Sequence, residues 1–224
     1  TASTMTSIVE ALGLALPGST SIPAMDAGHT RMATSCGERI VQMVWDDLTP
    51  RQILTRGAFM NAVAVQMALG GSTNATVHII AMARRAGVDL TLDHLDAIGR
   101  EVPVLANLFP SGDRLMEDFH YAGGLPALMS RIRAHLFLDQ RNVNGQTLEH
   151  NLEGVQVLDD AVIRPLNNPV SANGALAVLR GNLAPDGAVM KASAASPKFF
   201  QHRGRAIVFD DPAAMNAACA DANL

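Results

Sequence analysis

The segment Gly70-Gly71-Ser72-Thr73-Asn74 joins two glycines to three small polar side chains between two apolar stretches. It is expected to open a helix, and a helix N-terminus exposes unpaired N–H groups with a partial positive charge that can hold a carboxylate or phosphate. Ser and Thr are also common N-caps, so an ordinary capped helix is the alternative. We take Ser72, Thr73 and Asn74 as candidate substrate-binding residues.

A second polar cluster lies in the run from Met116 to Tyr121 and contains Glu117, Asp118 and His120. Two carboxylates beside an imidazole can bind a divalent metal, hold a polyhydroxylated substrate or transfer protons. A solvated surface loop is the alternative, because such residues are common on surfaces. We predict that this cluster and the Ser72 segment open on one shared cavity.

Lys191 follows the apolar stretch Ala188–Met190, so its side chain either projects from a strand end toward a pocket or is an exposed edge lysine. We include it among the candidate substrate-binding residues. Cys36 and Cys219 have no Cys or His near them in sequence, so neither is predicted to be a metal ligand or nucleophile. No catalytic residue and no metal ligand is assigned within this segment.

Five helices are expected to position these residues in the first part of the chain. Caps, Gly/Pro stops and apolar spacing place them at residues 3–16, 26–45, 50–69, 72–87 and 91–98. Val102–Leu105 is predicted to be a buried strand, and Pro126 to open a helix that ends near Leu136. The pattern favours an α/β fold with helices packed on a buried sheet, assigned to residues 1–139 as the later part of an α/β/α domain.

The composition changes after about Asp139. Residues 140–161 are expected to be a linker, and residues 162–224 to begin a β-rich, barrel-like domain with short strands at 162–163, 175–179, 188–190 and 206–209. Asp211-Pro212 is typical of an N-cap and first residue of a closing helix.

The charge balance, the length of the apolar runs and the cysteines exclude several classes of function. The 224 residues include 17 basic and 21 acidic side chains, which leaves no basic surplus for nucleic acid. No apolar run reaches the roughly 18 residues of a membrane helix. The two distant cysteines favour reduced thiols and a cytoplasmic protein. The chain opens at Thr1 without a Met, so we expect an internal piece of a longer protein.

Several ordered motifs resemble the iron–sulfur dehydratases of dihydroxy acids, phosphogluconate and aldonates. They are Thr1-Ala2-Ser3-Thr4-Met5, Glu10-Ala11-Leu12-Gly13, Leu16-Pro17-Gly18, Gly70–Asn74, Met116-Glu117-Asp118 and Leu179–Pro185. The stretch Lys191–Pro197, followed by His202–Ala206, is most similar to the sugar-acid branch, which acts on pentonates such as arabinonate or xylonate.

The resemblance implies a hydro-lyase that converts an aldonic acid to a 2-keto-3-deoxy acid. A base would remove the C2 proton while a cluster iron acts as Lewis acid on the C3 hydroxyl and Mg²⁺ holds the carboxylate. It also implies an iron–sulfur cluster, expected to be [2Fe–2S] rather than [4Fe–4S], and a homo-oligomer, either dimer or tetramer. The cluster cysteines and magnesium ligands would all lie outside this segment, which alone should be inactive.

Two alternatives stay open. One is a dihydroxy-acid dehydratase of branched-chain amino-acid biosynthesis, and the other is a non-catalytic α/β binding domain. The second alternative explains the missing nucleophile and metal ligands without assuming a longer protein.

Overall fold

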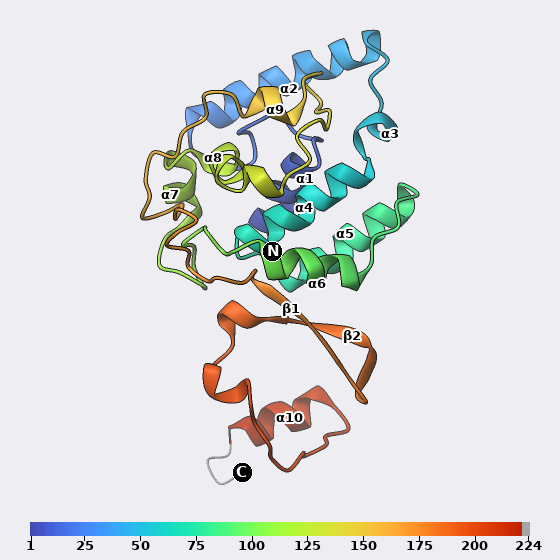
Figure 1. Cartoon of the computed structure of the whole chain (residues 1–224), viewed down its shortest axis with the longest axis vertical. Helices are drawn as coiled ribbons and strands as arrows, with labels where there is room; N and C mark the ends of the chain where they lie inside the picture. The colour runs from blue at the N-terminus through green and yellow to red at the C-terminus, as the bar shows by residue number, and fades with distance from the viewer. Residues whose placement is uncertain (221–224) are drawn as a thin grey trace. The chain divides into compact units, whose positions relative to one another are not determined.

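The chain forms two compact units, the first from Thr1 to Ala194 and the second beginning at Ala195 (Figure 1). The computed structural model describes residues 1–220 of the 224. Among these residues, no helix is both long enough and apolar enough to cross a bilayer.

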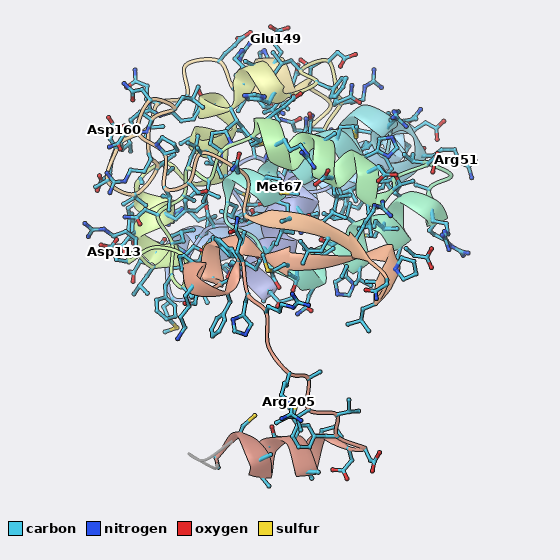
Figure 2. All side chains as sticks on the ribbon, turned by 60° about the horizontal axis from the view of Figure 1, so that its bottom comes forward. Arg51, Met67, Asp113, Glu149, Asp160 and Arg205 are labelled. Carbon is cyan, nitrogen blue, oxygen red and sulfur yellow. The ribbon has the colours of Figure 1, made fainter. Side chains whose placement is uncertain are left out.

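The first unit is built around helix α4 (Arg56–Ala68), which is apolar around most of its circumference and almost wholly buried. Helix α1 (Ala2–Ala11) packs along it, and so do α5 (Thr73–Arg85) and α6 (Leu92–Glu101). Met67 of α4 lies in the interior, whereas Arg51, Glu149 and Asp160 lie at the periphery (Figure 2). The core that supports the polar segments is therefore helical.

Two predicted helix ends differ from the structure. The helix expected at 50–69 is two helices, α3 (Pro50–Ile53) and α4, because Thr55 forms a second N-cap that accepts from the Ala58 N–H at 3.1 Å. Helix α1 ends at Ala11 instead of Leu16. Gly13 has φ +83°, and a Cβ there would lie 2.8 Å from the Arg141 carbonyl oxygen, so the chain must turn at a glycine.

Helices α2, α5 and α6 lie close to their predicted positions, whereas the helices after residue 115 differ from the prediction. Helix α2 (Ala27–Trp45) has Asp26 as its N-cap, which accepts from the Gly28 N–H at 2.6 Å. The candidate residues Glu117, Asp118 and His120 lie in a short helix, α7 (Met116–Tyr121), and not in a loop. It leads into α8 (Gly124–Arg131), a 3₁₀ turn at Arg133–His135 and, farther on, α9 (Leu148–Asn151). The helix predicted to reach Leu136 thus ends at Arg131.

The predicted strands at 102–105 and 162–163 are wrong as strands. Both segments are buried, but they form isolated bridges, Val104 with Ser171 and Ala106 with Ile163. The partner stretch contains Pro165 and Pro169, which have no N–H to donate, so a continuous ladder cannot form.

Within residues 1–220 the named sheet is a two-stranded antiparallel hairpin, β1 (Leu176–Gly181) and β2 (Ala184–Lys191). Leu176 pairs with Lys191, and β1 packs on α6 while β2 contacts α5. The fold is therefore helix-rich α/β. A barrel-like domain is not seen in the described residues, and the domain boundaries proposed above stay a prediction.

The described part of the second unit contains a 3₁₀ turn at Pro197–Phe199 and helix α10 (Pro212–Cys219). Asp211 caps α10 by accepting from the Ala214 N–H at 2.8 Å, as predicted. Residues 206–209 form no strand; their side chains are mostly exposed, so no packed sheet face orders them here.

Candidate functional site

The N-termini of α1 and α5 meet at the glycine turn that precedes Ser72. The Thr1 and Ser72 hydroxyl oxygens lie 3.1 Å apart, and the Asn74 amide donates to the Thr1 hydroxyl at 3.0 Å. The Ser72 N–H donates to the Thr4 hydroxyl at 3.2 Å. Ser72 is also the N-cap of α5, since its hydroxyl accepts from the Asn74 N–H at 3.3 Å. Two helix N-termini therefore lie side by side with small polar side chains around them.

Glycine 71 allows this close approach. A Cβ at Gly71 would lie 2.9 Å from Thr4 Cγ2 and 3.0 Å from the Gln66 carbonyl oxygen. The buried Gln66 amide donates to the Ser72 carbonyl and to the Thr76 hydroxyl, each at 3.1 Å. These hydrogen bonds attach the turn to α4. The Gln66 Oε1 atom is buried without a hydrogen-bond partner among the described residues.

Lys191 reaches the same turn from the end of β2. Its Nζ donates to the Gly70 carbonyl at 2.7 Å, and its half-buried position lowers the pKa of the ammonium group by desolvation. Two residues further on, the Ser193 hydroxyl lies 2.9 Å from that of Ser111. The structure thus brings Lys191 to the Gly70 carbonyl, in the turn that precedes Ser72, rather than leaving it on an open strand edge.

The polar residues of α7 have other partners. Asp118 accepts from the Leu115 N–H at 2.8 Å and so caps its own helix, while Glu117 is exposed. His120 Nδ1 lies 3.3 Å from the Ser21 hydroxyl, and the Tyr121 hydroxyl donates to Asp26 at 3.2 Å. The pKa of Asp26 is lowered, first by the Gly28 N–H and then by Tyr121. Ser21, Asp26 and Tyr121 were not predicted as site residues, because their contacts join segments far apart in sequence.

Glu10 is a buried carboxyl group that begins one of the family motifs but was not predicted as a site residue. It accepts from the Gly18 N–H at 2.7 Å, from the Thr20 N–H at 3.1 Å and from the Thr20 hydroxyl at 2.5 Å. Burial raises its pKa, and the hydrogen bonds oppose that effect. Glu10 therefore fixes the loop that carries Thr20 and Ser21 to His120.

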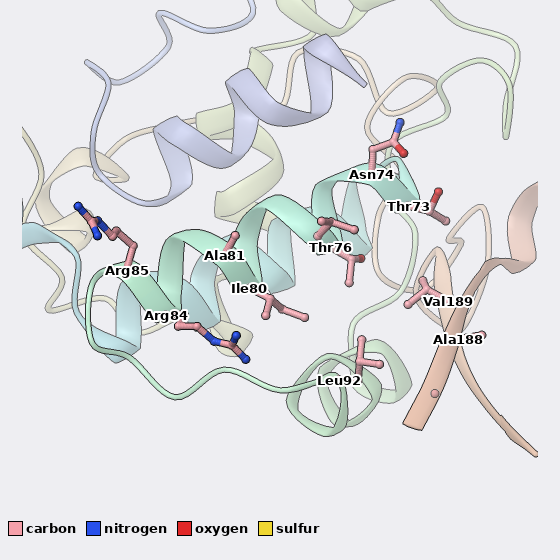
Figure 3. Close-up of a pocket in the computed structure, with 12 residues that line it drawn as sticks. Thr73, Asn74, Thr76, Ile80, Ala81, Arg84, Arg85, Leu92, Ala188 and Val189 are labelled. Carbon is pink, nitrogen blue, oxygen red and sulfur yellow. The ribbon is translucent and has the colours of Figure 1, made fainter. Parts of the chain in front are cut away.

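A cavity of about 900 Å³ runs along the outer face of α5 (Figure 3). Thr73 and Asn74 lie at one end of it and Arg84 and Arg85 toward the other, with Leu92 and residues 187–189 of β2 across from them. No residue of α7 lines this cavity, and neither does Lys191. The predicted cavity shared by the Ser72 segment and α7 therefore stays a prediction.

The described residues do not suit a metal or cluster site. Among residues 1–220, no group of three or more His, Cys, Asp or Glu side chains could hold a metal ion, and Cys36 and Cys219 are exposed free thiols. An iron–sulfur cluster or Mg²⁺ would need ligands from elsewhere in the protein.

Comparison with known families defines the class of this protein. The sequence model described as "Dihydroxy-acid/6-phosphogluconate dehydratase N-terminal" matches residues 1–151, and the corresponding C-terminal model matches residues 161–224. The chain therefore belongs to the dihydroxy-acid/6-phosphogluconate dehydratase family, which confirms the resemblance found in its motifs.

Three relatives with named activities are between 48% and 56% identical to this chain. The chain is 56% identical over 214 residues to 6-deoxy-6-sulfo-D-gluconate dehydratase of Pseudomonas putida, covering 94% of this chain and 37% of the relative. It is 49% identical over 217 residues to L-arabinonate dehydratase of Rhizobium leguminosarum bv. trifolii, covering 96% and 38%. It is 48% identical over 212 residues to a dihydroxy-acid dehydratase of Clostridium novyi, covering 94% and 38%. The chain thus spans little more than a third of these relatives' length.

Proposed function

We propose that the full-length protein is a hydro-lyase that dehydrates an aldonic acid to a 2-keto-3-deoxy acid. The family match supports the reaction class, and relatives named for sulfogluconate and arabinonate support a sugar-acid substrate. The observation in this chain that carries the proposal is the meeting of two helix N-termini at Thr1 and Ser72.

This arrangement suits a polyhydroxylated acid. The paired N-termini offer partial positive charge to an anionic group, and Lys191 adds a cation beside the same turn. Ser72, Thr73 and Asn74 supply hydroxyl and amide groups that can donate to and accept from substrate hydroxyls. The proposed role of the segment is to bind and orient the acid through these groups.

The overall reaction is balanced as the loss of one water. The proton at C2 and the hydroxyl at C3 leave, and the resulting enol tautomerises to the 2-keto acid. We assign no residue of this chain to the proton removal or to the departure of the hydroxyl. The [2Fe–2S] cluster and the Mg²⁺ that the resemblance implies would be bound by residues outside the chain. The working enzyme is proposed to be a cytoplasmic homo-oligomer.

Dehydration of a branched-chain dihydroxy acid is the second candidate, because relatives with that name are also close to half identical. Both substrates are 2,3-dihydroxy acids, but an aldonate carries further hydroxyls that need hydrogen-bond partners. The stretch Lys191–Pro197, followed by His202–Ala206, favours the aldonate, because it is most similar to the sugar-acid branch. A non-catalytic binding domain is disfavoured by the family match over both halves of the chain.

The test is a substrate panel on the full-length holoenzyme, whose iron content is measured first. Steady-state kinetics on L-arabinonate, D-xylonate and a branched 2,3-dihydroxy acid are expected to give a kcat/KM at least roughly tenfold higher for one pentonate than for the branched acid, about 1.4 kcal/mol of preference. A preference for the branched acid would reject the aldonate assignment, and no turnover of any of them by iron-loaded enzyme would reject the reaction class.

A further inference from the structure

A buried hydrogen-bond network ends on one half-buried imidazole, that of His120 in α7. The Ser21 hydroxyl, whose residue is 6% exposed, lies 3.3 Å from His120 Nδ1. The other ring nitrogen, Nε2, has no hydrogen-bond partner among residues 1–220 and is not one of the buried polar atoms of that part of the chain. The ring is therefore held at one nitrogen from the interior and open at the other.

Tyr121 restricts the orientation of the same imidazole. The two ring centroids lie 5.2 Å apart at an interplanar angle of 63°, which is an edge contact. Tyr121 is itself held in place, because its hydroxyl donates to Asp26, the N-cap of α2, at 3.2 Å. The His120 ring thus has two neighbours that fix its direction.

The fold places Ser21 through two features that are unfavourable by themselves. The buried carboxyl of Glu10 accepts from Gly18 and Thr20, and so holds the loop next to Ser21. At Gly124 an added Cβ would lie 2.5 Å from Ser21 Oγ, so only glycine leaves room for the hydroxyl there. Ser21 is therefore positioned both by α1 and by the start of α8.

The burial of Ser21 assigns the tautomer of the imidazole. His120 Nδ1 is the one hydrogen-bond partner of the Ser21 hydroxyl among residues 1–220. A buried hydroxyl proton without an acceptor is unfavourable, so Ser21 donates and Nδ1 accepts. In the neutral imidazole the ring proton then lies on Nε2. His120 consequently presents an N–H donor on the side that the described chain leaves open.

The charges around His120 indicate which acceptor this donor suits. Asp26 is close enough that His120 is one of the causes of its lowered pKa, and Arg31 is another. Glu117 lies one turn earlier in α7, and Asp118 caps the start of that helix. Three carboxylates and one guanidinium disfavour a further anionic group here. A neutral hydroxyl oxygen fits the donor better than a carboxylate.

We propose that His120 Nε2–H donates to a hydroxyl oxygen of the bound substrate, and that Ser21 is the positioning residue that fixes the ring for this contact. The inference rests on the proposed function, because a hydroxyl-bearing acid supplies the acceptor. His120 binds and orients the acid and transfers no proton. Since Ser21 acts through His120, the effects of removing the two are expected to be non-additive.

The first experiment compares two replacements of His120 in the iron-loaded full-length enzyme, on the acid of the substrate panel that it turns over best. His120→Asn keeps an amide near the Nδ1 position only, and should lower kcat/KM by at least roughly tenfold. His120→Gln carries an amide N–H to the Nε2 position and should stay within about threefold of the wild type. His150→Asn is the matched control, because that exposed imidazole lies in α9, 3.6 Å from Glu153, and should leave kcat/KM unchanged.

The second experiment is a double-mutant cycle. Ser21→Ala is expected to lower kcat/KM roughly three- to tenfold in the wild type, but to cause no further loss in the His120→Gln background. Thermal melts and iron content of every variant show whether fold and cluster are retained.

Two results would overturn this inference alone while the wild-type enzyme still dehydrates its acid. One is equal activity of the His120→Asn and His120→Gln variants, and the other is the same loss from Ser21→Ala in both backgrounds. Absence of turnover of any panel acid by the iron-loaded wild type would instead reject the proposed function, and this inference with it.

Discussion

The Thr1 hydroxyl lies 3.1 Å from the Ser72 hydroxyl, although 71 positions separate the two residues. Each is the N-cap residue of its helix, α1 and α5, so this contact joins two positively polarised helix ends. The proposed function depends on this contact.

The first prediction concerns the glycine that permits the contact. Gly71→Ala places a Cβ within 3.0 Å of backbone and side-chain atoms, which must push α1 away from the turn. Overpacking of this kind costs about 1–3 kcal/mol, so the free energy of unfolding should fall by that amount. Gly181→Ala is the control, because a Cβ there meets nothing within 4 Å. Equal stability of the two variants in urea denaturation would contradict the assigned role of Gly71.

The second prediction concerns the pH dependence of stability at Glu10. Burial raises the pKa of this carboxyl above its ordinary value of 4.5. A carboxyl whose folded-state pKa is raised binds its proton more tightly in the folded state, so its contribution is complete below the unfolded pKa and is lost as pH rises through the folded pKa. The stability of the wild type should therefore fall relative to Glu10→Gln as pH increases above about 4.5. Urea denaturation of both proteins from pH 4.5 to 7 checks this, and parallel curves would show that the pKa is not raised.

The third prediction concerns Lys191. Lys191→Met removes the ammonium group that donates to the Gly70 carbonyl at 2.7 Å. We expect a loss of about 1 kcal/mol in stability, since the group is half-buried, and a higher KM for the anionic substrate. Lys198→Met serves as the control, because it removes the same charge from the second unit. A KM that shifts equally in both variants would mean that charge acts at long range and that Lys191 has no local role.

Local signals allowed much of the helical fold to be predicted. The predicted caps at Ser72 and Asp211 depend on residues within three positions of each helix start, and the structure confirms both. The second N-cap at Thr55 was missed because the apolar spacing continues across it. The buried segments at 102–105 and 162–163 were assigned as strands because burial alone does not reveal whether a partner can complete a ladder.

The candidate site was predictable only in part, because contacts between residues far apart in the sequence leave no local pattern. The Ser72 segment was found because its glycines and hydroxyls are consecutive. Its partners Thr1, Thr4 and Lys191 come from positions about 70 to 120 residues away, and no local pattern indicates that they meet. The burial of Glu10 was not predicted, although the residue begins a family motif, because a single carboxylate within a helix is ordinarily exposed.

The most direct test of substrate binding at the Ser72 segment compares two N-cap substitutions in the iron-loaded full-length enzyme. Ser72→Ala should lower kcat/KM for the preferred pentonate by roughly five- to 150-fold, because a substrate hydroxyl left unpaired costs about 1–3 kcal/mol. Thr147→Ala removes a matched cap, which accepts from the His150 N–H at 3.3 Å in α9. Each variant should lose about 0.5–2 kcal/mol of stability, but only Ser72→Ala should lose activity. Full activity in Ser72→Ala, or activity that falls only in step with stability and iron content, would contradict the proposed substrate-binding role of this segment.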